Sequence, residues 1–225
     1  AKCCLVSSPA VSGPAARRRL LPESVAPALV RFLVPGTSGR FRCGGLSVEY
    51  QTARLVASLC PTELVTYRER SQDHRYLDDC LAQEPPDPKI LWVVSWGFDV
   101  PGLIRRLNGR RVVYHAHSSQ YGFSLPPGVP VLAVSRNTLG YWGDRAPRNP
   151  LFLVPNALEH VWLERGDRSA RQRRPIDVLV QARKSSTYVL SRLVPALRQS
   201  GLVVEVQIGW VDDLVDLFNL SLIHI

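Results

Sequence analysis

Short β-branched apolar runs alternate with segments of helical spacing along this chain, and that alternation restricts it to few folds. Each run ends in glycine, proline or small polar residues before the next helical segment begins. The runs are residues 28–34, 63–67, 90–97, 112–114, 131–134 and 151–154. Strands that alternate with helices are typical of βαβ units in a parallel sheet. The sequence therefore predicts an α/β protein.

The same pattern stops and then begins again in the last third of the chain. Residues 159–175 are rich in arginine and lack an apolar period, so we interpret them as a linker. A strand at 176–180, a helix at 188–199, a strand at 202–208 and a helix at 211–218 follow. We predict a Rossmann-like parallel-sheet domain over residues 28–158 and an incomplete second Rossmann-like domain over 176–225.

The composition limits the location and the partners. Residues 1–27 are rich in Pro, Ala, Ser and Arg without the apolar core of a signal peptide, so we interpret them as a disordered or non-native leader. The five cysteines show no spacing typical of zinc, which fits reduced thiols in a cytoplasmic protein. A net charge of +9 favours anionic partners. Much of it is clustered in arginine runs, and we do not expect nucleic acid to be the partner.

Two histidines mark the expected position of a site. Val112, Val113 and Tyr114 form an apolar strand, and His115 and His117 follow where that strand should end. In open parallel sheets, ligands bind beyond the carboxyl ends of the strands. The pair therefore predicts the floor of a binding site. A buried histidine bonded to the backbone, with the other in solvent, is the alternative.

Glycine and small polar residues follow other strands. The pair Gly44–Gly45 precedes a helix predicted at 46–59, an arrangement that exposes backbone N–H groups to a phosphate. The pair matches neither GxGxxG nor GxxxxGK[ST], so a plain tight connection is the alternative. Ser135 and Asn156 each follow a strand on the same expected edge. Their alternative explanations are a helix N-cap and a turn.

With these residues placed, the chain resembles bacterial glycosyltransferases of the two-domain GT-B type, specifically the retaining, nucleotide-sugar-dependent family-four enzymes. The resemblance rests on the order and spacing of several short segments. They are Gly44–Gly45, His115–His117, residues 133–137, residues 154–157 and Arg183–Lys184. It implies a hexosyltransferase that takes a nucleotide diphosphate sugar as donor and an unknown glycan, lipid or small molecule as acceptor.

The resemblance also implies roles for individual residues. It assigns the catalytic contact with the transferred sugar to His117 or His115. It assigns binding of the donor phosphates to four residues: Gly44, Gly45, Arg183 and Lys184. Ser135 and Asn156 would line the cleft. No cofactor is expected besides the donor substrate. A metal is not expected either, because no DxD-type carboxylate pair lies at a strand end: Asp78–Asp79 and Asp212–Asp213 fall inside predicted helices.

One departure from the family concerns a Glu-x7-Glu motif late in its second domain. No glutamate follows Glu205 here. We therefore expect a C-terminally truncated enzyme that is inactive alone. We expect its location to be the cytoplasm, with or without peripheral contact with the inner membrane face. Turnover of a nucleotide sugar by the purified chain would refute the inactivity. A non-catalytic Rossmann-like module that binds a nucleotide or sugar is the alternative function, and a dinucleotide-dependent oxidoreductase or epimerase is less well supported.

Overall fold

The computed structural model describes residues 26–41, 43–119, 121–156, 161, 164–165, 174–182, 185–209, 211 and 213–224. The chain divides into two compact units, Ala1–Pro155 and Asn156–Ile225. The expected leader as far as residue 25 and most of the expected linker lie outside the described residues. In the part of the chain that the structure describes, no helix is long and apolar enough to cross a membrane.

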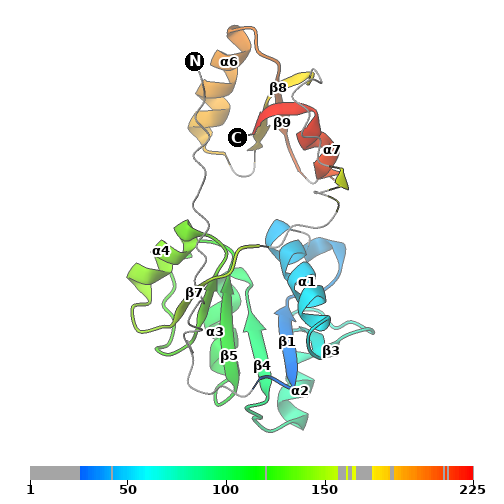
Figure 1. The fold of residues 1–225 in the computed structure, drawn as a ribbon, viewed down its shortest axis with the longest axis vertical. Helices are drawn as coiled ribbons and strands as arrows, with labels where there is room; N and C mark the ends of the chain where they lie inside the picture. Colours follow the sequence, from blue (N-terminus) through cyan, green and yellow to red (C-terminus); the bar gives the residue numbers. More distant parts are fainter. Residues whose placement is uncertain are drawn as a thin grey trace, which may run out of the picture. The chain divides into compact units, whose positions relative to one another are not determined.

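The first unit contains a seven-stranded parallel sheet (Figure 1). Its strands are β1 (Leu29–Val34), β2 (Thr62–Thr66), β3 (Arg75–Tyr76), β4 (Ile90–Val94), β5 (Arg111–Ala116), β6 (Val131–Ala133) and β7 (Leu151–Leu153). Their spatial order is β3-β2-β1-β4-β5-β6-β7. Strands β2 and β3 thus extend the sheet on one side of β1, and strands β4 to β7 extend it on the other side. The predicted α/β fold with a Rossmann-like sheet is confirmed.

Strand β1 lies at the centre because its sequence can be buried on both faces. Five of its six residues are buried. Phe32 is in register with Leu64 of β2 on one side and with Val93 of β4 on the other. Continuous β-branched and apolar runs of this kind are characteristic of parallel strands with both faces covered.

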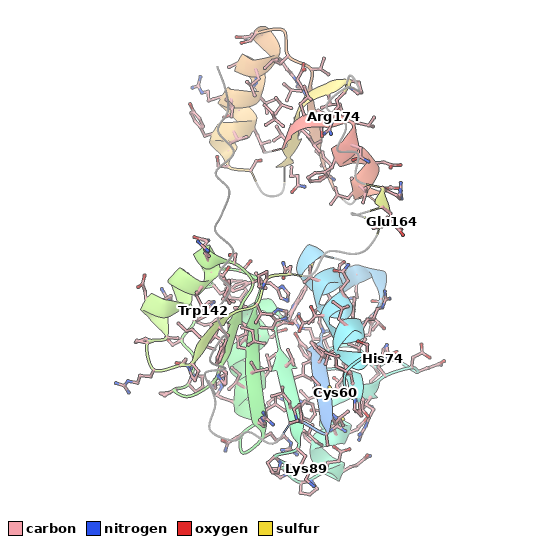
Figure 2. All side chains as sticks on the ribbon, viewed as in Figure 1. Cys60, His74, Lys89, Trp142, Glu164 and Arg174 are labelled. Atoms are coloured by element: carbon pink, nitrogen blue, oxygen red, sulfur yellow. The ribbon has the colours of Figure 1, made fainter. Side chains whose placement is uncertain are left out.

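Helices cover both faces of the sheet. They are α1 (Gly44–Ala57), α2 (Leu77–Gln83), α3 (Val100–Arg106) and α4 (Arg136–Arg145), with 3₁₀ turns η1 (Gly39–Phe41) and η2 (Gly97–Asp99). On one face, Ala53 of α1 packs in a cluster with Val93 and Val113. On the other, Leu103 of α3 and Trp142 of α4 share a larger core, where Figure 2 labels Trp142. Because strand side chains alternate, the α1 face of β5 carries Val113 and then His115.

Three expectations about the first unit need correction. His115 lies inside β5 rather than after it, because that strand extends to Ala116. Gly44 and Gly45 form the first turn of α1 rather than a preceding loop, because Cys43 Sγ accepts a hydrogen bond from the Leu46 N–H (3.4 Å) and caps the helix. Strand β3 was not expected. It has only two residues and depends on its pairing with β2.

The second unit contains a three-stranded parallel sheet with the order β10-β8-β9. Its elements are β8 (Ile176–Gln181), η4 (Val189–Leu193), α6 (Val194–Gln199), β9 (Val204–Gln207), α7 (Leu214–Asn219) and β10 (Ser221–His224). Strand β10 pairs with β8 through Ser221 and Ile176. Here too, successive strands lie on opposite sides of the first one, as they do at the switch point of a doubly wound sheet.

Two details of the second unit differ from expectation. The helix predicted at 188–199 begins with the π-helical turn η4 before α6. Pro195 has no N–H group and therefore cannot donate an i→i−4 hydrogen bond across this junction. Asp213 lies before α7 rather than inside it, since its carboxylate accepts a hydrogen bond from the Asp216 N–H (3.1 Å) as N-cap. Asp212 lies outside the described residues.

Candidate functional site

The point where the strand order of the first unit reverses lies between β1 and β4. Ligands of open α/β sheets bind beyond the carboxyl ends of the strands at such a point. Helix α1 follows β1 through a short connection, and β5 lies next to β4 on the other side. The carboxyl end of β5 and the first turns of α1 therefore supply the residues of the candidate site.

A buried carboxylate joins the two histidines. Glu49, on the second turn of α1, accepts hydrogen bonds at one oxygen, Oε2, from His115 Nδ1 (2.7 Å) and from His117 Nε2 (2.7 Å). The side chains of Glu49, His115 and His117 are 0%, 3% and 11% exposed. The two imidazole centroids lie 4.2 Å apart. We call these three residues the Glu49 cluster.

The charge of Glu49 follows from these contacts. Burial opposes ionisation, but the hydrogen bonds from His115 and His117 outweigh it and hold the pKa of Glu49 below its usual value. An ionised carboxylate only accepts hydrogen bonds, so the nitrogen that each imidazole turns toward it must carry the hydrogen. In its uncharged form His117 is therefore the Nε2–H tautomer, with a lone pair on Nδ1.

Two acceptor atoms of the Glu49 cluster remain unsatisfied. Glu49 Oε1 and His117 Nδ1 are buried without a hydrogen-bond partner among the described residues. Buried polar atoms in folded proteins are rarely left unpaired, because the lost hydration costs free energy. Since both atoms accept hydrogen bonds, their missing partners must be donors or cations. The cluster can therefore orient an imidazole, hold a metal ion or receive a hydroxyl group.

The first turn of α1 reaches the same place. A Cβ placed on Gly45 would lie 3.8 Å from His117 Cβ, whereas one on Gly44 would meet nothing within 4 Å. The first N–H groups of an α-helix have no partner within the helix. The structure thus places the first turn of α1 beside His117 at Gly45, while the space beside Gly44 is open.

The other expected site residues have different positions. Ser135 is the N-cap of α4, where its Oγ accepts a hydrogen bond from the Thr138 N–H (3.1 Å). Asn156 is exposed and begins the second unit. Arg183 and Lys184 follow β8 in the sequence and lie outside the described residues. Ser135 therefore has its hydrogen-bond partner in α4, through Thr138, and not in the Glu49 cluster.

Sequence reasoning missed Glu49, although a signal was present. Leu46, Ala53 and Val56 form the apolar stripe of α1, and Glu49 falls between Leu46 and Ala53 on that stripe. A charged side chain on the buried face of a helix requires a partner. The pair of histidines on a neighbouring strand was the available partner.

Aromatic side chains that the sequence analysis also missed lie at the same sheet edge. Phe98 in η2 follows β4 and packs edge-to-face on Tyr121, with ring centroids 5.3 Å apart. Phe98 is 76% exposed. Beneath it, Asp99 accepts a hydrogen bond from the Tyr67 hydroxyl (2.9 Å) and pairs with Arg68. An exposed aromatic ring held on a fixed base offers a stacking surface.

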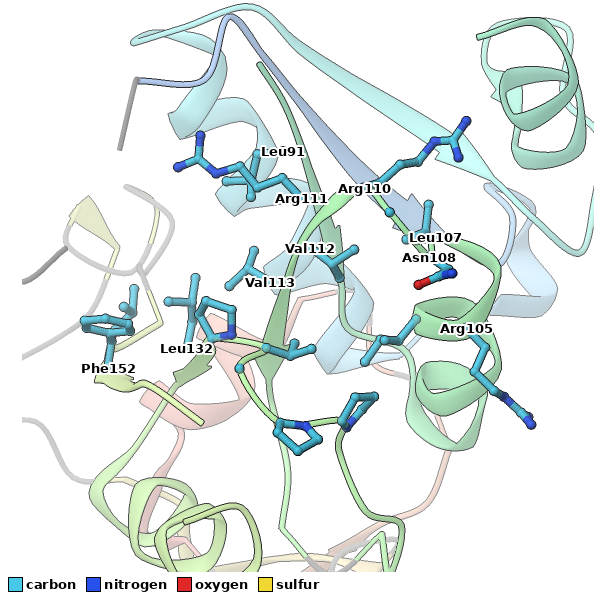
Figure 3. Close-up of a pocket in the computed structure, with 18 residues that line it drawn as sticks. Leu91, Arg105, Leu107, Asn108, Arg110, Arg111, Val112, Val113, Leu132 and Phe152 are labelled. Carbon is cyan, nitrogen blue, oxygen red and sulfur yellow. The ribbon is translucent and has the colours of Figure 1, made fainter. Parts of the chain in front are cut away.

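A cavity of about 1080 Å³ lies elsewhere, at the amino ends of β4 and β5. Its lining is mainly aliphatic and includes Leu91, Val113 and Leu132. Figure 3 shows Arg105 and Arg110 at its rim with their guanidinium groups directed away from these side chains. No set of polar groups converges inside it, so we place the candidate site at the Glu49 cluster instead.

No family model, no curated protein and no solved structure matches the chain.

Proposed function

We propose that this chain is a glycosyltransferase that uses a nucleotide diphosphate sugar as donor. The observation that carries the proposal is the unpaired Nδ1 of His117, beside the first turn of α1 and the switch point of the sheet. A lone pair there can accept a hydrogen bond from a sugar hydroxyl. Because Nδ1 itself is buried, the His117 ring, which is 11% exposed, would have to turn outward to make that contact. The neighbouring N–H groups of the helix suit an anion.

The donor phosphates are assigned to the amide groups of Gly44 and Gly45. Helix α1 has 14 residues, and Cys43 accepts hydrogen bonds from the N–H groups of Leu46 and Ser47. The N–H groups of Gly44 and Gly45, at the positive end of the helix dipole, have no partner within the helix. Glycine leaves that backbone uncovered, as the open space beside Gly44 indicates. Arg183 and Lys184, which follow β8, are assigned to the same diphosphate as charge partners.

The transferred sugar is assigned to His117. Glu49 fixes the orientation of its imidazole, and His117 is the most exposed member of the cluster. In the transfer, an acceptor hydroxyl oxygen forms a bond to the anomeric carbon as the bond from that carbon to the diphosphate breaks. The nucleoside diphosphate leaves with the bonding electron pair, and the proton of the acceptor passes to it or to solvent. Positive groups at the diphosphate stabilise the charge that develops there.

Calorimetric titration tests the donor class. We expect saturable binding of one donor from a panel of UDP, GDP and ADP sugars, and no comparable binding of NAD. His117→Ala and the double variant Arg183→Ala/Lys184→Ala should each weaken binding about tenfold, the loss of one or two charge-assisted hydrogen bonds. His74→Ala, in the loop before β3, is the matched control. Binding of NAD alone, or of no nucleotide, would overturn the proposal.

A second measurement separates a transferase from a binding module. Release of free nucleoside diphosphate from the bound donor is followed with and without a mixture of glycan, lipid and small-molecule acceptors. Acceptor-dependent release supports the transferase and refutes the expected inactivity of this chain alone, while saturable binding without release in any mixture fits both that inactivity and the non-catalytic alternative.

A further inference from the structure

We infer that the Glu49 cluster is a binding site for a divalent transition metal, and that Zn²⁺ is the ion that suits it best. Glu49, His115 and His117 each offer a ligand atom, and these atoms all lie within 4.8 Å of one another. They come from two rigid elements, α1 and the end of β5. This inference goes beyond the proposed sugar transfer and does not depend on it.

The ligand types fit zinc, and the two hydrogen-bonded contacts of 2.7 Å would widen to admit the ion. Two imidazole nitrogens and one carboxylate oxygen are ordinary Zn²⁺ ligands, and three protein ligands with one open position form a common arrangement. His115 lies on the α1 face of β5, and His117, one residue beyond the strand, directs its imidazole to the same carboxylate. Glu49 lies one turn into α1, where its carboxylate reaches both rings at 2.7 Å.

The charge of the cluster favours a cation. The pair of imidazole N–H groups satisfies Glu49 Oε2 but does not neutralise the carboxylate, and Oε1 is buried with no partner among the described residues. A buried charge without compensation is costly. Glu49 is 0% exposed, so a sugar hydroxyl cannot reach it, and only a small species fits. A metal bound by the carboxylate supplies the missing charge and can contact Oε1.

Metal binding is compatible with the rest of the site. The nitrogens that now donate to Glu49 are the ones that would bind the ion, and each ring hydrogen would move to the other nitrogen. His117 would then present Nδ1–H, which has no partner in the described part of the chain. In the metal-bound form this group would donate to the oxygen of a sugar hydroxyl, whereas the metal-free ring accepts from the hydroxyl hydrogen. Metal-bound histidines commonly use that second nitrogen as a donor.

Two other occupants would leave the site without metal. A proton on one imidazole would balance the charge of Glu49, and a water molecule would donate one hydrogen bond to Oε1. Both predict a cluster that ignores divalent ions, so metal titration distinguishes them from the proposal.

The test uses the full chain after treatment with a chelator. Zn²⁺ is titrated in competition with a chromophoric chelator, and Co²⁺ is titrated in parallel with its visible absorption as readout. We expect one tight equivalent of Zn²⁺ and a Co²⁺ spectrum with visible bands but no thiolate charge-transfer band. That spectrum distinguishes metal bound by the Glu49 cluster from metal bound by any of the five cysteines. It is recorded on the unsubstituted chain, so it does not depend on whether a variant folds.

Variants locate the site. Glu49→Gln and His117→Ala should each weaken Zn²⁺ binding by about 100-fold or more, since loss of even an outer-shell partner can approach that effect. His74→Ala, the matched control, should leave it unchanged. Absence of the thiolate-free Co²⁺ spectrum, or equal Zn²⁺ affinity in all three variants, would overturn the inference. Failure of nucleotide binding with the metal site intact would overturn only the proposed function.

Discussion

Gly45 lies against His117: a Cβ on the glycine would be 3.8 Å from His117 Cβ and 3.9 Å from its Cγ. These are ordinary contact distances, so a single methyl group fits and a branched side chain does not. Position 45 therefore lies at contact distance from the ring that Glu49 orients.

This contact predicts different effects at the two glycines. Gly45→Val should displace the His117 ring and destabilise the chain by about 1–3 kcal/mol, the usual cost of overpacking. Gly44→Val is the matched control, because it changes helix propensity by the same amount but places the new side chain where a Cβ would meet nothing within 4 Å. Urea unfolding of both variants measures the difference. Equal losses would mean that the contact with His117 does not limit residue size at position 45.

The central strand contains a second buried charge, Arg31 of β1. Its guanidinium pairs with Glu63 (Nε to Oε2, 2.9 Å) and with Glu84, and it lies 5.0 Å from the centroid of the Trp92 ring. Hydrogen bonding with Arg31, and secondarily with Arg75, lowers the pKa of Glu84 from 4.5 to about 2.

The depressed pKa of Glu84 gives a pH dependence of known sign. Because the folded value is below the unfolded one, the stabilisation is complete above pH 4.5 and is lost as the pH falls from 4.5 to about 2. We expect a contribution of about 2 kcal/mol at neutral pH, less than the full shift implies because Glu84 is 29% exposed and partly screened by solvent.

Unfolding free energies at pH 7, 4.5 and 3 check this prediction. Glu84→Gln should lower stability at pH 7 and remove most of the acid-induced loss between pH 4.5 and 3. Asp73→Asn, at an exposed loop residue, should leave that loss unchanged. Acid sensitivity in Glu84→Gln equal to that of the unsubstituted chain would contradict the assignment.

Ser135 has a structural role that can be separated from a ligand contact. As N-cap of α4, its hydroxyl satisfies the Thr138 N–H. Ser135→Ala should therefore cost about 1 kcal/mol of stability, while Ser135→Asp retains an acceptor and should cost much less. Thermal unfolding of both variants, together with nucleotide titration, checks this. Weaker nucleotide binding in both variants would instead support the cleft-lining role.

The strands were predictable because burial on both faces requires apolar runs. Ile90–Val94 is buried in its last three residues and was recognised from its composition. Strand β3 was not recognised, since Arg75 and Tyr76 carry no pattern and pair only because β2 presents its edge. The π-helical turn before α6 likewise depends on one missing N–H group rather than on hydrophobic periodicity.

The site was only half predictable for a related reason. His115 and His117 were recognisable because polar residues followed an apolar strand, whereas Glu49 acquires its role from a contact across 68 residues of sequence to His117. Helix periodicity placed Glu49 on the buried face, but nothing local identified its partner. Chemistry shared between distant elements requires the packing to be known.

Phe98 gives a prediction that tests ligand binding with little risk to the fold. Its ring is 76% exposed and contacts Tyr121 at the edge of the sheet that carries the Glu49 cluster. If the nucleotide base or the sugar stacks there, Phe98→Ala should weaken nucleotide sugar binding about tenfold, in line with about 1–3 kcal/mol for stacking of one base. Because the side chain is mostly in solvent, stability should change by less than about 0.5 kcal/mol.

Leu59→Ala, an 86% exposed apolar residue beyond the other end of α1, is the control for a general surface effect. Calorimetric titration and urea unfolding of both variants make the measurement. Unchanged affinity in Phe98→Ala would place the ligand away from this ring, and a loss shared with Leu59→Ala would show that the effect is not local.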